Sequence, residues 1–221
     1  MAKNFGIIIY RNIPNIVTIL GVFPLALLFS EHGYQYLIPL IVYNNIMDDL
    51  DGILAGKLNL KSDFGAKLDN VCDAVSHTLF VMAIGMHYGL ACGFISAVAI
   101  AAILIRVVSR LDPSNEKGTG SPTNELIRHV FFALLLSEMF SFNPVLPLIA
   151  IFLLNTVSMH IPYPMPYMIR SQAKAATTVG MVNILLISAW LFPYALPIIA
   201  GCFFSAYLYS FVKIVLGTDQ K

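Results

Sequence analysis

The chain has 221 residues, of which 58% are hydrophobic and only 11% carry a charge, and its formal net charge is +1. With a mean hydropathy of +0.78, a water-soluble domain of this size has no way to bury so much apolar surface. The composition therefore excludes an ordinary soluble enzyme and predicts one all-α integral membrane domain over residues 1–221. We expect the lipid bilayer to be its environment, and we expect no nucleic-acid partner.

A short amphipathic segment, Ala2 to Arg11, opens the chain. It suits the membrane surface better than it suits a cleavable signal. Apolar segments follow, each close to the length of about 20 residues that a helix needs to cross a bilayer. We therefore expect a polytopic fold of about eight transmembrane helices, at residues 15–31, 37–56, 65–88, 91–110, 124–141, 143–160, 175–191 and 193–216.

The basic residues mark one side of the membrane. All thirteen Lys and Arg residues lie at alternate ends of the predicted spans. By the positive-inside rule, both termini and the loop after the second span face the cytoplasm, in what we expect to be the cell (inner) membrane. The proline-rich stretch from His160 to Tyr167 is incompatible with a continuous helix. We expect it to form the cytoplasmic loop between the sixth and seventh spans.

Charged residues are most concentrated at the end of the second span and the start of the third. Asp48 and Asp51 are three residues apart in one predicted helix, and Asp69 and Asp73 are four apart in the next. Either spacing places both carboxylates on one helix face. Acidic residues in membrane segments are costly and usually functional. Because four converging carboxylates repel one another unless a cation lies between them, the sequence predicts a divalent metal site.

Carboxylate oxygens are the ligands that Mg²⁺ and Mn²⁺ prefer, and a cation held in this way is suited to phosphoryl chemistry. Gly52 and Ala55 follow one turn after the first pair, where small residues leave room for a ligand or a neighbouring helix. Asp49 lies about 100° around the helix from Asp48. We expect Asp49 to cap the helix, pair with a lysine or face water, and Asp63 to be a loop or N-cap residue.

These residues belong to a longer pattern, Asp48-x2-Asp51-Gly52-x2-Ala55-x9-Gly65-x3-Asp69-x3-Asp73. The pattern resembles the signature of the CDP-alcohol phosphotransferases, D-x2-D-G-x2-A-R-x8-G-x3-D-x3-D, and matches seven of its eight fixed positions. The departure is the arginine after the alanine, where this chain has Gly56 followed by Lys57. Lys57 either takes over the role of that arginine or leaves it unfilled.

The resemblance implies a phosphatidyltransferase of phospholipid synthesis, acting as a homodimer. Such an enzyme moves a phosphatidyl group from CDP-diacylglycerol to a small alcohol and releases CMP. Carried over, Asp48, Asp51 and Asp69 hold Mg²⁺ or Mn²⁺, and Asp73 is the catalytic base with a possible share in a second metal. The resemblance further implies that the motif positions Gly52, Ala55 and Gly65 contact substrate, and Lys57 is a candidate to do so in place of the missing arginine.

Three further groups of residues are candidates with an alternative reading. The segment Asn12 to Thr18, with Pro14 between them, resembles the family's cytidine-lining segment, although Asn or Thr near a helix start often caps it. Arg106 and Arg110 share a helix face and suit a pyrophosphate or an acceptor carboxylate. The alternative for these arginines is a general position at the membrane edge.

His77 lies one turn beyond Asp73 on the same helix face. On an apolar helix it is either a hydrogen-bonded packing residue or a contact of the substrate.

Within the family, the chain resembles the phosphatidylserine synthases and the bacterial phosphatidylcholine synthases. We favour serine as the acceptor, because the arginine pair is suited to its carboxylate and Ala74 stands where choline enzymes carry a tyrosine. Choline or another polar alcohol is the alternative. Two rivals belong to other classes: an intramembrane prenyltransferase, whose aspartate motifs lie far apart in the chain, and a catalytically silent homologue that binds nucleotide or lipid, which Gly56 would favour.

Overall fold

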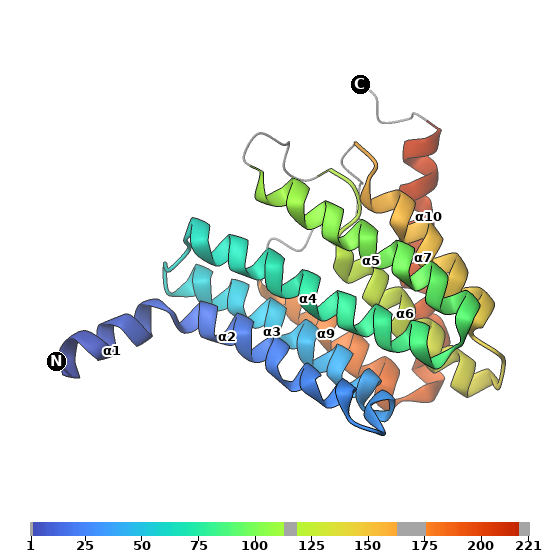
Figure 1. Cartoon of the computed structure of the whole chain (residues 1–221), viewed down its shortest axis with the longest axis horizontal. Helices are drawn as coiled ribbons and strands as arrows, with labels where there is room; N and C mark the ends of the chain where they lie inside the picture. The colour runs from blue at the N-terminus through green and yellow to red at the C-terminus, as the bar shows by residue number, and fades with distance from the viewer. Residues whose placement is uncertain (1, 113–118, 163–175, 217–221) are drawn as a thin grey trace.

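A computed structural model describes residues 2–112, 119–162 and 176–216 of the chain. Throughout these ranges the regular structure is helical, with no strand, which confirms the all-α prediction (Figure 1). The helices in chain order are α1 Ala2–Arg11, α2 Ile13–Val22, η1 Phe23–Phe29, η2 Gly33–Tyr36, α3 Leu37–Lys57, α4 Asp63–His87, α5 Leu90–Leu111, α6 Thr123–Phe140, α7 Val145–Met159, α9 Ala176–Leu191, η3 Pro193–Ala195 and α10 Leu196–Val215. The η elements are short 3₁₀ helices.

The N-terminal helix α1 projects away from the bundle (Figure 1). Its isoleucines Ile7, Ile8 and Ile9 are all exposed. An apolar helix that the rest of the chain leaves uncovered fits a position at the boundary between lipid and water. The predicted helix at this end of the chain is therefore present.

The number of membrane spans remains a prediction. Among the described residues, two helices are long and apolar enough to cross a membrane by length and composition, Leu90–Leu111 and Pro193–Lys213. The apolar helices Ile13–Phe29, Val145–Met159 and Gly180–Leu191 are shorter. Helices α3 and α4 are long enough, but they carry the aspartates that lower their hydropathy. Each of the eight predicted segments overlaps a described helix, and α7 ends before the proline-rich stretch, whose residues 163–167 lie outside the described ranges.

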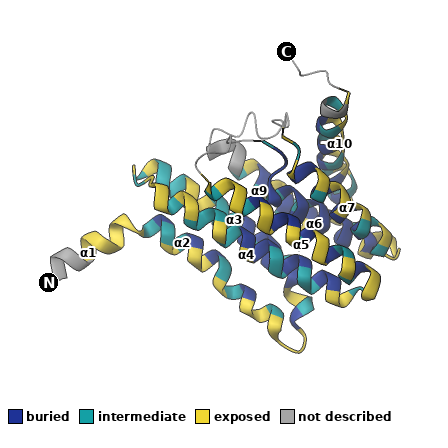
Figure 2. Cartoon of the chain, turned by 45° about the horizontal axis from the view of Figure 1, so that its top comes forward, coloured by how far each residue is buried: buried dark blue, intermediate teal, exposed yellow. Residues whose placement is uncertain are grey.

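The outward surface of α5 is suited to contact with lipid rather than with water. Phe94, Val98, Ile105 and Val108 are between 46% and 69% exposed, and they recur at the spacing of one helix face. Exposed residues follow the outer sides of the helices in the same way in Figure 2. A continuous apolar face on the outside of a bundle is stable against lipid chains and unfavourable in water.

Helix α6 lies at the centre of the bundle, in contact with α3, α4, α7 and α10. It is buried on nearly every side, and its Phe131 and Phe132 are among the largest fully buried side chains, together with Phe80 and Phe152. On one side of this core, α2, α3 and α4 pack together (Figure 1). The antiparallel pair α3 and α4 therefore places the end of one helix beside the start of the next.

The start of α4 is fixed by Ser62, whose hydroxyl oxygen accepts a hydrogen bond from the backbone N–H of Gly65 at 3.0 Å. This contact is a regular N-cap and satisfies one of the free donors of the first turn. Asp63 is the first residue of the helix and forms an exposed ion pair with Lys67 at 2.9 Å. The prediction that Asp63 lies in the loop or caps the helix is therefore wrong, because the neighbouring serine takes the cap.

Candidate metal centre

Three of the four predicted aspartates converge. Asp48 and Asp51 from α3 and Asp69 from α4 each offer one carboxylate oxygen, and these oxygens all lie within 4.8 Å of one another. Asp51 is buried, whereas Asp48 and Asp69 are partly buried. The spacing of three residues within α3 brings the first pair to one face, and the antiparallel packing of α4 adds the third carboxylate. Three hard oxygen donors at this separation fit one small divalent cation such as Mg²⁺ or Mn²⁺.

Asp73 is not part of this group of three, although it lines the same small pocket between α2, α3 and α4. It lies one helical turn beyond Asp69 along α4. Thr18, Cys72 and Ser76 also line this pocket. The predicted set of four therefore divides into three close carboxylates and a fourth that faces the same space.

The predicted contact segment at the start of the first span lies beside the aspartates. The hydroxyl of Thr18 hydrogen-bonds the carboxylate of Asp51 and lies 3.1 Å from the carbonyl oxygen of Pro14. Asn12 makes no side-chain capping bond. Its side-chain Nδ2 atom instead donates to the carbonyl oxygen of Ile8 at 2.9 Å. Helix capping therefore does not account for Asn12 or Thr18.

The beginning of α4 approaches the beginning of α2 closely at Gly65. A Cβ atom built on Gly65 would lie 3.0 Å from the Oδ1 atom of Asn15 and 3.1 Å from the Oγ atom of Ser62. The side chain of Asn15 in turn donates to the Oδ1 atom of Asn12 at 3.0 Å. The glycine of the motif therefore allows two segments that are far apart in sequence to lie against each other.

The motif residues after the first aspartate pair border open space. A Cβ atom on Gly52 would meet no heavy atom of the described neighbours within 4 Å, and Ala55 is partly buried. Lys57 is exposed at the end of α3. At Gly56, where the family motif has arginine, a Cβ atom would lie closest to the Cε atom of Lys61, at 3.8 Å. Lys61, which is not one of the motif positions, therefore lies beside the position of the missing arginine.

The two arginines of α5 have different surroundings. Arg106 is buried and donates hydrogen bonds to the carbonyl oxygens of Met159 at 2.6 Å and Thr119 at 3.2 Å. These bonds tie α5 to the end of α7 and to the segment before α6. Arg110 is exposed, and its positive charge acts on the carboxylate of Asp69. The charge of Arg110 thus reaches Asp69 of the aspartate cluster.

Asparagine side chains that the sequence reasoning did not identify surround the aspartates. Asn124, on the first turn of α6, donates from Nδ2 to the Oδ2 atom of Asp48 at 2.8 Å. Asp49 accepts hydrogen bonds from Asn45 at 3.2 Å and from Asn183 of α9 at 2.6 Å. The one signal in the sequence was the position of Asn45, about one turn before the aspartates on the same helix.

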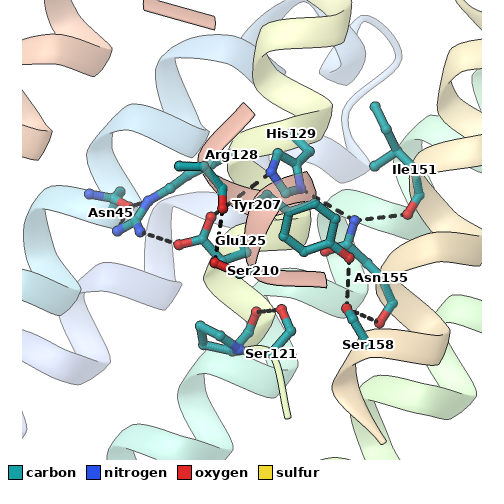
Figure 3. A network of polar contacts seen from close by, with 12 residues as sticks. Asn45, Ser121, Glu125, Arg128, His129, Ile151, Asn155, Ser158, Tyr207 and Ser210 are labelled. Atoms are coloured by element: carbon teal, nitrogen blue, oxygen red, sulfur yellow. Dashed lines mark hydrogen bonds and ion pairs between the residues drawn. The ribbon is translucent and has the colours of Figure 1, made fainter. Parts of the chain in front are cut away.

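A buried polar network holds Asn45 in place (Figure 3). Arg128 of α6 donates to the Oδ1 atom of Asn45 from Nε at 3.1 Å and from Nη2 at 3.0 Å. The same guanidinium forms an ion pair with Glu125 at 3.2 Å. Because buried charges are stable only when paired and hydrogen-bonded, this arrangement fixes α6 against α3 and orients the amide that faces the aspartates.

Comparison with known proteins gives a match over most of the chain. Residues 11–207 match the family described as CDP-alcohol phosphatidyltransferase. An "Uncharacterized protein" of Aquifex aeolicus (strain VF5) is 37% identical over 83 residues, which are 36% of this chain and 42% of that protein. The chain thus spans less than half the length of this relative, whereas the family match includes the whole aspartate site. The chain therefore belongs to the CDP-alcohol phosphatidyltransferase family, a family of membrane-bound transferases of phospholipid synthesis.

Proposed function

We propose that this protein transfers the phosphatidyl group of CDP-diacylglycerol to the hydroxyl of a small alcohol, with serine as the favoured acceptor, and releases CMP. Membership of the family implies transfer of a phospholipid head group from a CDP-alcohol. The observation that carries the proposal is the convergence of the Asp48, Asp51 and Asp69 oxygens within 4.8 Å of one another. This convergence lies beside the α2 segment that resembles the family's nucleotide contact.

The metal that this family typically uses fits the donor set of the site. Asp48, Asp51 and Asp69 would hold it, since three carboxylates so close together repel one another without a cation. When bound, a divalent cation here neutralises the charge of the pyrophosphate. Either Mg²⁺ or Mn²⁺ satisfies the oxygen-only chemistry of these ligands.

The side chains around the cluster divide the remaining tasks. Thr18 fixes the orientation of the Asp51 carboxylate through its hydroxyl. The open space at Gly52 leaves room for the pyrophosphate. The oxygen of the acceptor forms a bond to the phosphatidyl phosphorus, and the bond from that phosphorus to the bridging oxygen of CMP breaks. The hydroxyl proton passes to the Asp73 carboxylate, which acts as general base.

Serine is the acceptor that the charges around the site favour. Its carboxylate needs a cation, and the exposed guanidinium of Arg110 acts on the aspartate cluster from α5. Arg106 is less suited to this task, because its guanidinium already donates to backbone carbonyl oxygens. We therefore propose a function like that of the phosphatidylserine synthases, with Arg110 as the carboxylate contact, and a homodimer as the assembly on the strength of the family resemblance.

Replacing Arg110 by alanine is expected to raise the KM for serine about tenfold, because a charge-assisted hydrogen bond contributes about 1.5 kcal/mol or more. The KM for CDP-diacylglycerol should change much less. Lys67→Ala is the matched control, since it removes an exposed cation from α4 that pairs with Asp63. A weaker affinity for the nucleotide lipid with an unchanged serine KM would instead assign Arg110 to the pyrophosphate.

The proposed activity is tested by incubating the purified protein with labelled CDP-diacylglycerol, Mn²⁺ or Mg²⁺, and one acceptor at a time. Serine, choline, inositol and glycerol phosphate are compared, and the lipid product is identified by mass spectrometry. We expect phosphatidylserine and CMP in equal amounts. Phosphatidylcholine without phosphatidylserine would contradict the choice of acceptor, and no CMP release with any acceptor would contradict the enzyme assignment and favour a silent homologue.

We further propose that the aspartate site lies on the cytoplasmic side of the cell membrane. Single cysteines are introduced at Lys67, near the start of α4, and at His32 and Asn143 in the opposite loops, after the three native cysteines are removed. An impermeant thiol reagent added to intact cells should label His32→Cys and Asn143→Cys. It should label Lys67→Cys only after lysis. The reverse pattern would place the active site on the other side of the membrane.

A further inference from the structure

A second pocket adjoins Asp48 on the side that faces α6. Its walls come from α3, α4 and α6, and its lining residues are Ile41, Asn44, Asn45, Asp48, His77, Asn124 and Ile127. It has room for one group of the size of a water molecule. Asn44 and Asp48 also line the pocket that contains the other aspartates, so the second pocket borders the proposed reaction site directly.

His77 lines this pocket, and its side chain carries a nitrogen atom that lacks a protein partner. Its side chain is only 3% exposed, and Nδ1 has no hydrogen-bond partner among the described residues. A buried polar atom without a partner is destabilising. A ligand group that donates a hydrogen bond to this nitrogen would remove the cost.

The amide groups of the pocket are engaged in other contacts. The Nδ2 atom of Asn44 donates to the carbonyl oxygen of Gly21 at 3.4 Å and to the hydroxyl of Ser76 at 3.1 Å. The Nδ2 atom of Asn45 donates to Asp49 at 3.2 Å and to Asn183 at 2.8 Å.

Asn124, the third amide of the pocket, donates from Nδ2 to the carboxylate of Asp48. The groups that face a ligand are therefore chiefly acceptors, the His77 nitrogen and the Asp48 carboxylate. An ammonium group, with three donors and no acceptor, matches such a lining. The guanidinium of Arg128 forms an ion pair with Glu125.

The apolar wall limits the size of the group that enters. Ile41 is 2% exposed and Ile127 is 4% exposed, so both side chains are held by packing on their far sides. A space of one water molecule accepts an unsubstituted ammonium and excludes one that carries methyl groups. Steric exclusion of this kind discriminates against the wrong substrate without adding a contact to the right one.

We propose that this pocket receives the unsubstituted ammonium group of an amino-alcohol acceptor, with His77 accepting one of its hydrogen bonds and Ile127 excluding N-methylated acceptors. The inference rests on the proposed function and names the class of its acceptor. The acceptor's hydroxyl then lies toward Asp73, one turn nearer the membrane surface along α4.

Two sets of acceptors test the proposal, each alike except at the group in question: serine with N-methylserine and glycerate, and ethanolamine with N-methylethanolamine and ethylene glycol. The wild-type protein should use the ammonium compound of either set at least about tenfold better than its methylated or hydroxyl counterpart. His77→Leu should raise the KM for the ammonium acceptor and leave the KM for CDP-diacylglycerol unchanged. Thr78→Val is the control, because this neighbouring residue does not line the pocket.

Ile127→Ala should admit the N-methylated acceptors while it retains the unmethylated ones, which separates pocket size from loss of folding. A binding measurement is made alongside, by following the ¹⁵N resonance of the His77 imidazole during titration with ethanolamine. A shift without any CMP release would support the pocket and contradict the proposed function. Turnover with equal use of methylated or hydroxyl acceptors, or with no shift at His77, would overturn the pocket and leave the proposed function standing.

Discussion

Replacing Asp51 by asparagine is expected to reduce CMP release about a thousandfold or more, which corresponds to about 4 kcal/mol of lost transition-state stabilisation. Asp51 is buried, and its carboxylate oxygen lies within 4.8 Å of oxygens from Asp48 and Asp69. Removing one charged ligand from a small oxygen-only site weakens the binding of Mg²⁺ or Mn²⁺. The substitution changes the charge and almost nothing of the shape, so the fold should persist.

The same result is expected for Asp48→Asn and Asp69→Asn, because each contributes one oxygen to the same group. Asp63→Asn is the matched control: it lies on the first turn of α4, is exposed and pairs with Lys67. Steady-state CMP release is measured for all four variants after their elution from a size-exclusion column is shown to match the wild type. Near-normal activity in any two of the three cluster variants would contradict the metal assignment.

Asp73→Asn is expected to lower kcat by about a hundredfold to ten-thousandfold, the range of a lost general base, while CDP-diacylglycerol still binds. Asp73 lies outside the group of three close carboxylates but faces the same pocket, so the three proposed metal ligands remain after the substitution. The measurement pairs single-turnover kinetics with a direct binding assay for the nucleotide lipid.

Two results would change the role given to Asp73. Unchanged turnover at neutral pH would remove it from proton transfer. Loss of nucleotide binding together with turnover would show that Asp73 acts chiefly as a metal ligand.

The convergence of the aspartates was accessible from the sequence because it depends on local geometry. Spacings of three and four residues fix which side chains share a helix face, and a short loop makes α3 and α4 antiparallel neighbours. Asn124 and Asn183 were not accessible in this way. Their contacts with Asp48 and Asp49 join helices separated by 76 and 134 residues, and no pattern in the sequence specifies which faces of those helices meet.

The arginines of α5 show a second limit of sequence reasoning. Arg106 and Arg110 share a helix face by spacing, but they are about 6 Å apart along the helix axis. The guanidinium of Arg106 donates to a carbonyl oxygen at the end of α7, whereas Arg110 is exposed. Periodicity predicts direction around a helix, whereas depth depends on the neighbouring segments.

The helix count illustrates the same distinction for the membrane. The apolar segments predicted the positions of the helices well, because length and hydropathy are local properties. The helices that build the site, α3 and α4, are less apolar because they carry the aspartates. The aspartates thus lower the hydrophobic signal in the two helices that form the candidate site.

The most direct test of the account is CMP release from CDP-diacylglycerol and serine as a function of free Mn²⁺, starting from protein treated with EDTA. We predict no release in EDTA, recovery that saturates as Mn²⁺ is added, and no recovery in Asp51→Asn over the same range of concentrations. Release at the full rate in EDTA would contradict a metal-dependent transferase at this cluster of aspartates.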